Sequence, residues 1–387
     1  MRAAIYVKTI DVQNIMNKIT GVLLLVLNTS SLLATDVRIA GMGGWNNVVQ
    51  DVEFEAFYNP ALLPNIERSY VIAGIGARFD KGTYGTAHTF MDTTIYTDTN
   101  YNYETYNPTL GLLMPVTVKG PYIGIMAGLD INCPDVPNNY GIINLRLAQK
   151  LKNFNIGVGY DNNLNAGNSY GNKLKSQVII GAYFGSKSNN YSVVYNRRYF
   201  NRQCRDSETT LTAYNSDNLS FNWFHKWKDC FLTALASSYA YERHDEYQSG
   251  YERREHDFGL QPSIQIRIKP INTIASAGIN LDLNIYQYKP YFISHYNTAY
   301  SNTNLHGWWC CGVETEITPF ITIRGGLNAG KDFVPKLYTT VYDQYSSYVF
   351  GTTYKINENI KMEYAFIPNF KRIKEDQDHY LKLIYSY

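Results

Sequence analysis

The stretch NTIASAGINLDLNIYQY, residues 272–288, decides the fold class because its apolar and polar residues alternate with a period of two. One face collects Thr273, Ala275, Ala277, Ile279, Leu281, Leu283 and Ile285. Only a β-strand gathers such a set on one face, because a helix would scatter it around its axis. Tyr286 and Tyr288 then supply the amphipathic rings that are typical of a membrane interface. The stretch is therefore predicted to be an amphipathic strand.

The same alternation recurs through the chain from Ser69 onward, for example over residues 122–132 and 257–270. No helical stretch is available to cover a sheet, and the polar face recurs on many strands. A secreted β-sandwich would also alternate, with its polar side to water. We favour an all-β, transmembrane, antiparallel β-barrel of the outer-membrane kind.

Composition supports this class. Charged residues make up 18% of the 387 residues and aromatics 15%, including 35 Tyr, as aromatic girdles require. Mean hydropathy is −0.30, which excludes a helical membrane protein. A net charge of +2 provides no basic field for nucleic acid. The five cysteines lack metal-ligand spacing, so neither a metal nor a cofactor is expected.

The C-terminus carries a second strong pattern. Leu381, Leu383, Tyr385 and Tyr387 fall on one face of a final strand that ends on an aromatic residue. Such an ending resembles the recognition signal of the outer-membrane barrel-assembly machinery. An ordinary edge strand is the alternative, but an open edge there would invite aggregation. We therefore expect this strand to close a barrel.

Turn spacing predicts the topology. Short connections alternate with long polar ones, the latter near residues 80–106, 132–140, 163–173, 200–218, 243–255, 288–307, 330–343 and 369–377. Read strictly, the pattern gives about sixteen strands, and merging weak ones near Trp308 to Gly326 gives about fourteen.

The N-terminus divides into segments that precede the barrel. Residues 16–34 have the basic start, apolar run and Ala34 cleavage site of a signal peptide, and residues 1–15 are an unneeded extension ahead of it. Residues 35–68 are too rich in Gly, Asn and Pro for a strand and are predicted to form a plug. Residues 69–387 form the barrel, and the expected location is the cell outer membrane.

The plug segment carries a family resemblance. The run from Arg38 to Gly44, then Asp51 and the run from Glu55 to Leu63, resembles the start of FadL-like outer-membrane transport proteins, including PorV/PorQ-type barrels. The resemblance implies a fourteen-stranded barrel whose lumen is closed by the N-terminal segment. In the transporter branch, hydrophobic molecules such as long-chain fatty acids pass through the lumen and leave at a strand kink. In the PorV branch the barrel serves protein secretion.

Five plug residues are candidates for ligand binding or gating: Gly43, Gly44, Asn59, Pro60 and Ala61. Glycine permits close backbone approach, Pro60 fixes φ, and the Asn59 side chain can bond neighbouring backbone. The alternative is that Asn59-Pro60-Ala61 is simply a tight entry into the first strand.

A candidate break in the wall lies at Gln261, Pro262 and Ser263, because proline cannot donate to a strand ladder. The charged run from Tyr241 to Asp257 is interpreted as a cross-strand ion-pair ladder on a solvated hairpin. It could also be imagined as a hydrolase site, but the sequence has no catalytic motif, so we expect no enzyme and no catalytic residues.

Two functions remain open. The first is uptake of hydrophobic small molecules, long-chain fatty acid-like, through a plugged lumen. The second is a PorV/PorQ-like barrel serving protein secretion, or a structural or adhesin protein. Expected partners are outer-membrane lipids, the barrel-assembly machinery through the C-terminal strand and a hydrophobic ligand, with no nucleic acid.

Overall fold

The computed structural model describes residues 52–90, 93–117, 120–133, 140–165, 173–186, 188–203, 210–246, 251–290, 300–333, 344–368 and 377–387. The signal-peptide segment and the first part of the plug segment, including Gly43 and Gly44, lie outside these residues. A helix and a 3-10 helix come first, followed by a long series of strands.

The elements are α3 (Val52–Tyr58), η1 (Pro60–Asn65), β1 (Tyr70–Phe90), β2 (Thr93–Pro115), β3 (Tyr122–Cys133), β4 (Tyr140–Lys150), β5 (Asn155–Asn165), β6 (Lys173–Gly185), β7 (Asn189–Gln203), β8 (Thr210–Lys228), β9 (Phe231–Glu246), β10 (Tyr251–Ile268), η2 (Lys269–Ile271), β11 (Thr273–Pro290), β12 (Tyr300–Thr318), β13 (Ile321–Phe333), β14 (Gln344–Lys355), β15 (Ile360–Pro368) and β16 (Gln377–Ser386).

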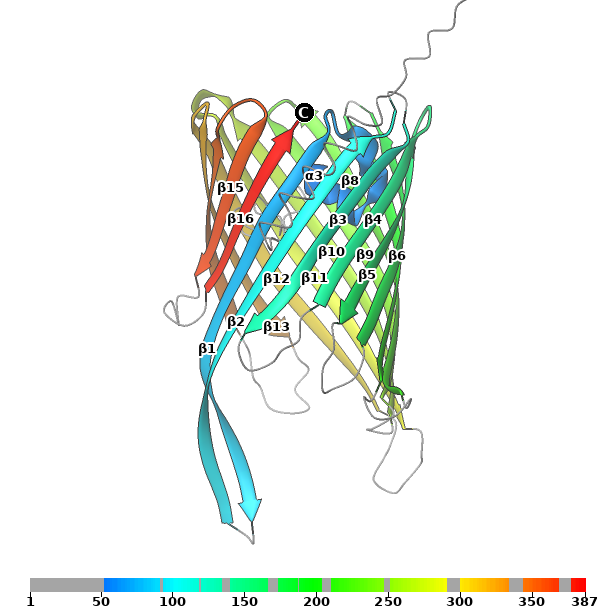
Figure 1. Cartoon of the computed structure of the whole chain (residues 1–387), viewed down its shortest axis with the longest axis vertical. Helices are drawn as coiled ribbons and strands as arrows, with labels where there is room; N and C mark the ends of the chain where they lie inside the picture. The colour runs from blue at the N-terminus through cyan, green and yellow to red at the C-terminus, as the bar shows by residue number, and fades with distance from the viewer. Residues whose placement is uncertain are drawn as a thin grey trace, which may run out of the picture.

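The strands form one closed antiparallel barrel in sequence order (Figure 1). The last strand closes it on the first, from Tyr70 opposite Ser386 to Phe79 opposite Gln377. Sixteen strands lie among the described residues, as the strict reading of the turns predicts. The count of fourteen implied by the family resemblance is wrong for this chain. The segment from Trp308 to Gly326 does not merge, because the chain turns at Pro319 and Phe320 between β12 and β13.

Most large apolar side chains of the described strands are exposed on the outer face, whereas many polar ones are buried on the inner face. On β10, Leu260, Ile264 and Ile266 are exposed, whereas Gln261 and Ser263 are buried. On β16, Leu381, Leu383 and Tyr385 are exposed while Lys382 and Ile384 are buried. This is the arrangement of a barrel in lipid, whose outer face needs no water.

The first hairpin corrects one expectation from the sequence. Residues 80–106 were expected to be a loop, but most of them belong to β1 and β2, which stay paired out to Phe90 and Thr93. Neighbouring strands stop earlier, since β16 reaches only Phe79 and β3 only Glu104. The hairpin therefore projects beyond the barrel at the end opposite the C-terminus (Figure 1). The polar residues of this stretch favoured a loop. Two paired strands outside a membrane nevertheless satisfy each other's backbone hydrogen bonds, whichever side chains they carry.

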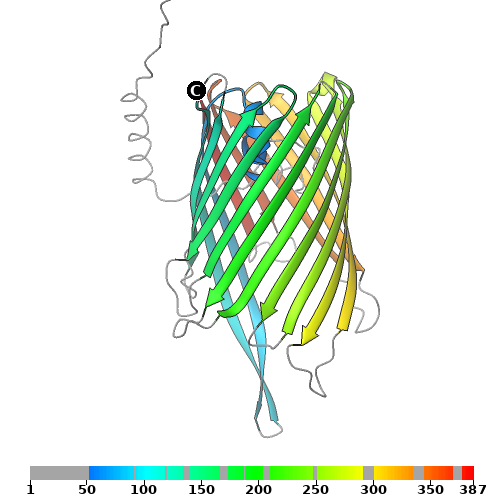
Figure 2. The same ribbon diagram turned by 90° about the vertical axis from the view of Figure 1, so that its right-hand side faces the viewer.

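Helix α3 and η1 lie within the barrel, at the end that carries the C-terminus (Figures 1 and 2). Phe57 and Leu63 are buried with Ile72, Leu113 and Ile384 in one apolar cluster. The inward faces of β1, β2 and β16 thus supply an apolar seat in an otherwise polar lumen. Among the described residues, no helix has the length and apolarity needed to cross a membrane.

Candidate functional site in the lumen

The triplet Asn59-Pro60-Ala61 forms the bend between α3 and η1. The Ala61 amide donates a hydrogen bond to Asn59 Oδ1 at 3.1 Å, so the Asn59 side chain caps η1. Pro60 begins η1, where its missing N–H costs nothing. All three residues are buried, with Asn59 only 5% exposed. The triplet therefore holds a compact turn inside the barrel rather than an entry into β1, which begins at Tyr70.

Two glycines on the inner wall make room for this turn. A Cβ added at Gly157 of β5 would lie 2.5 Å from the Pro60 carbonyl carbon and 2.6 Å from the Ala61 nitrogen. A Cβ at Gly181 of β6, which pairs with Gly157, would collide with Asn59 Oδ1. Only glycine permits such close backbone approach, so the wall and the turn are fitted to each other.

Arg146 of β4 fastens α3 to the wall. Its Nε donates to the Phe57 carbonyl oxygen at 2.6 Å, where the last turn of α3 leaves carbonyls without helical partners. The same guanidinium makes a two-pronged ion pair with Asp161 of β5, including Nη2–Oδ2 at 3.1 Å. Asn155 Nδ2 adds a bond to Asn65 Oδ1 at 3.1 Å. We call residues 52–66, held by these contacts, the seated plug.

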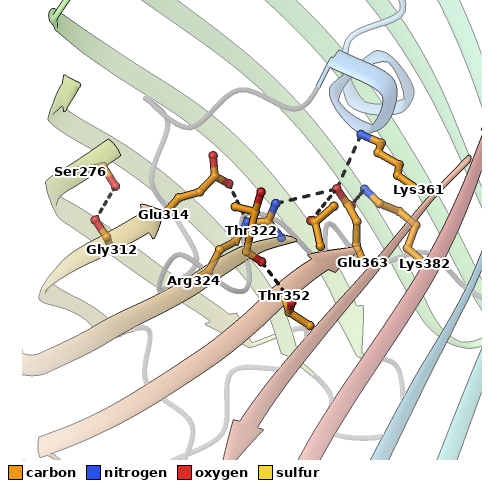
Figure 3. Close-up of polar contacts among 10 residues, drawn as sticks. Ser276, Gly312, Glu314, Thr322, Arg324, Thr352, Lys361, Glu363 and Lys382 are labelled. Carbon is orange, nitrogen blue, oxygen red and sulfur yellow. Dashed lines mark hydrogen bonds and ion pairs between the residues drawn. The ribbon is translucent and has the colours of Figure 1, made fainter. Parts of the chain in front are cut away.

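The opposite wall carries a row of charges on β12 to β16 (Figure 3). Arg324 Nε lies 2.6 Å from Glu314 Oε2, and its Nη2 lies 4.0 Å from Glu363 Oε1. Arg324 reaches across β14 because its partner there is Gly351, which has no side chain.

Glu363 gathers two lysines besides Arg324. Lys382 Nζ lies 2.9 Å from its Oε2 and Lys361 Nζ 3.6 Å from its Oε1. The side chains of Glu363 and Lys382 are 2% and 1% exposed. Charges so deeply buried persist only when paired, and here they link the strands next to the closing seam.

The β10–β11 pairing skips two residues, Gln261 and Pro262. The β10–β11 pairing runs down to Leu260 opposite Leu281 and resumes at Ser263 opposite Gly278 in the same register. Gln261 and Pro262 have no partner in β11, although both remain paired with β9. Gln261 Nε2 and Ser263 Oγ are buried beside this gap without a hydrogen-bond partner among the described residues.

A second interruption was missed in the sequence. The β2–β3 pairing skips Asn107 and Pro108, between Tyr106 opposite Ile131 and Thr109 opposite Gly128. The sequence signal was the same, a proline inside a strand, but it was hidden because this stretch was read as the end of a loop. Both gaps therefore follow from prolines that lack the donor a ladder needs.

The charged hairpin of β9 and β10 differs from its interpretation as a cross-strand ladder. The register places Glu255 opposite Glu242 and Arg254 opposite Arg243, so like charges face each other. Arg243 Nε does pair across the strands with Glu252 Oε1 at 3.5 Å, but Arg254 Nε, two residues away on the same strand, lies closer to that oxygen, at 2.6 Å. Residues two apart share a face of a strand, which explains the pairing.

Sequence reasoning missed the residues that seat the plug. Gly157, Gly181, Arg146 and Asp161 stood among many other polar-face residues with no motif around them. Gly157 and Gly159 on the inner face of β5 were the available signal, since adjacent inward glycines mark close approach of another segment. Which segment approached them could be known only from the register.

Solved structures of bacterial barrels resemble this one. CdiB from Acinetobacter baumannii matches with a TM-score of 0.50 and 11% identity, over 83% of this chain and 60% of that chain. A FadL homologue from Pseudomonas aeruginosa matches with 0.47 and 11%, over 93% and 99%. The P. putida toluene transporter TodX matches with 0.44 and 9%, over 90% and 97%.

This chain thus spans three fifths of the length of CdiB. A comparison with protein-family models gave no match. A comparison with curated proteins also gave none. At these identities the likeness is one of fold alone, and the chain is itself a closed all-β barrel.

Proposed function

We propose that this chain is an outer-membrane barrel that takes up hydrophobic small molecules, long-chain fatty acid-like, through a plugged lumen. The observation that carries the proposal is the pairing of a seated plug with an interrupted wall. The seated plug occupies the lumen at one end, held by Arg146 and fitted against Gly157 and Gly181. A ligand entering from the other end therefore needs a route that avoids the plug.

The gap at Gln261 and Pro262 offers such a route. Missing ladder bonds lower the cost of separating β10 from β11 locally, and the outer side of the wall there is lined by exposed Leu260, Ile264 and Ile279. An apolar molecule leaving sideways would pass directly into lipid without crossing water. The unbonded Gln261 Nε2 and Ser263 Oγ would meet its polar end on the luminal side.

Uptake of labelled fatty acids in a deletion strain, complemented with variants, tests this proposal. Pro262→Val restores a backbone donor, and we expect it to lower uptake by favouring a continuous ladder. Pro319→Ala, in the exposed β12–β13 turn, is the matched control and should leave uptake unchanged. Equal uptake with and without the protein across a panel of apolar compounds would refute transport.

A second candidate function, a barrel that serves another protein, is favoured by the projecting β1–β2 hairpin. Within the described part of the chain, neither edge of this hairpin has a neighbouring strand beyond Phe79 and Glu104, and exposed edges can pair with an added strand. Replacing residues 82–98 with a tight turn separates the two functions. Loss of secretion or adhesion with normal uptake would favour the second, and loss of neither would remove it.

A further inference from the structure

The luminal face of the β9–β10 hairpin holds a cluster of metal-ligating side chains outside the seated plug. Glu242, His244 and Glu255 each offer a ligand atom, and these atoms all lie within 4.8 Å of one another. His244 Nε2 is 3.4 Å from Glu242 Oε2. The three residues come from two adjacent strands, so a rigid ladder holds them at fixed spacing.

The register shows that this face is the luminal one. Gly157, which contacts the plug, pairs with Gly181, and the same face continues through Val194, Ser220 and Ser238 to Gly259 of β10. Glu255 lies two pairs of residues from Gly259 and so shares its face, as does Glu242 opposite it. The cluster therefore opens to the lumen, not to lipid.

Charge placement gives an independent indication that a cation belongs here. Glu242 and Glu255 are directly opposite each other, an arrangement that repels. Asp257 adds a carboxylate on the same face, and its Oδ1 is buried without a hydrogen-bond partner among the described residues. Glu255 itself is 94% buried, with 6% of its surface exposed. A cation bound among these carboxylates would relieve the repulsion between them.

Arg253 supplies part of the positive charge beside these carboxylates. It pairs with Glu255, and its guanidinium carbon lies 4.8 Å from the centre of the Tyr286 ring and 5.9 Å from that of Tyr288. These aromatic contacts orient Arg253 toward β11. Glu242, directly opposite Glu255, instead has His244 Nε2 at 3.4 Å from its Oε2.

We propose that Glu242, His244 and Glu255 bind a divalent transition-metal ion of the Zn²⁺ class. One imidazole and two carboxylates suit such an ion better than Ca²⁺, which takes six or more oxygens. Tetrahedral bonds of roughly 2.0–2.1 Å place donor atoms about 3.3 Å apart, close to the spacing already present between His244 and Glu242. The bound ion would tie β9 to β10 near the outer rim of the lumen and neutralise the opposed glutamates.

The test is calorimetric titration of the full-length, untagged barrel in detergent after EDTA treatment, with ZnCl₂ as the probe. We expect about one ion per chain and an affinity that falls at least about tenfold in His244→Ala and in Glu242→Gln. His256→Ala is the matched control, because His256 lies on the other face of β10 beside Tyr239, and it should bind like wild type.

Each outcome decides the proposal. Unheated gel mobility confirms that every variant is a closed barrel before titration. Binding that is lost with His244 or Glu242 but kept without His256 supports the site. No binding by wild type, equal binding by His244→Ala, or uptake of CaCl₂ and MgCl₂ but not ZnCl₂ overturns it.

Discussion

Replacing Gly157 by alanine tests whether the seated plug depends on close approach to the wall. The added Cβ would lie 2.5 Å from the Pro60 carbonyl carbon, whereas ordinary contact begins at 3.4 Å. The plug backbone must therefore retreat by about 1 Å, because optimal carbon contacts are roughly 3.5–4.0 Å apart. The two nearest atoms are main-chain atoms of a buried turn and the third, Pro60 Cβ at 2.8 Å, belongs to a rigid ring, so no flexible side chain can move instead.

Overpacking of this kind costs about 1–3 kcal/mol, which weakens the seating equilibrium by a factor of about 5–150. Gly325 provides the control, since a Cβ there meets nothing within 4 Å. Conductance in planar bilayers measures the result. We expect Gly157→Ala to show more frequent or larger open events than wild type, and Gly325→Ala to match wild type. Identical traces for all three proteins would refute the fitted-wall argument.

Three further predictions follow from the same structure. Arg146→Met should cost about 3 kcal/mol in denaturant unfolding, because it leaves the partly buried Asp161 without its ion-pair partner. The double variant with Asp161→Asn should recover part of that loss. Glu363→Gln should lower stability by a similar amount, whereas Glu316→Gln, a half-buried residue near the β12–β13 turn, should change it by less than about 0.5 kcal/mol. Removing residues 385–387 should reduce the amount of folded barrel in membrane fractions if the final strand directs assembly; unchanged amounts would contradict that role.

The barrel itself could be predicted from sequence because its signal is local. Alternation over residues 272–288 sets inner and outer faces without knowledge of any other strand. The strict reading of the turn spacing predicted the sixteen strands, whereas the family resemblance implied fourteen. The ends of strands outside a membrane were harder to predict, because polar residues such as those of 80–106 form a strand or a loop equally well.

The luminal contacts could not be predicted, because they depend on register between distant strands. Asp161 is an ordinary polar residue until pairing places it beside Arg146, and Arg324 reaches Glu363 only because Gly351 lies between them. The pairing of charges in the β9–β10 hairpin could not be predicted for the same reason. Sequence showed acids and bases close together, but a shift of one pair decides whether unlike or like charges meet.

The closing seam imposes an order on folding. The Tyr387 amide donates a hydrogen bond to the Ser69 carbonyl oxygen at 3.0 Å, so the C-terminal end of the barrel bonds to the residue just before β1. Contacts between such distant positions form late, since nearly the whole chain must be searched to make them. The seated plug is made earlier in synthesis, yet it contacts β3 to β6 from inside. The seated plug can therefore reach its place against β3 to β6 before the last strand pairs with the first and closes the barrel.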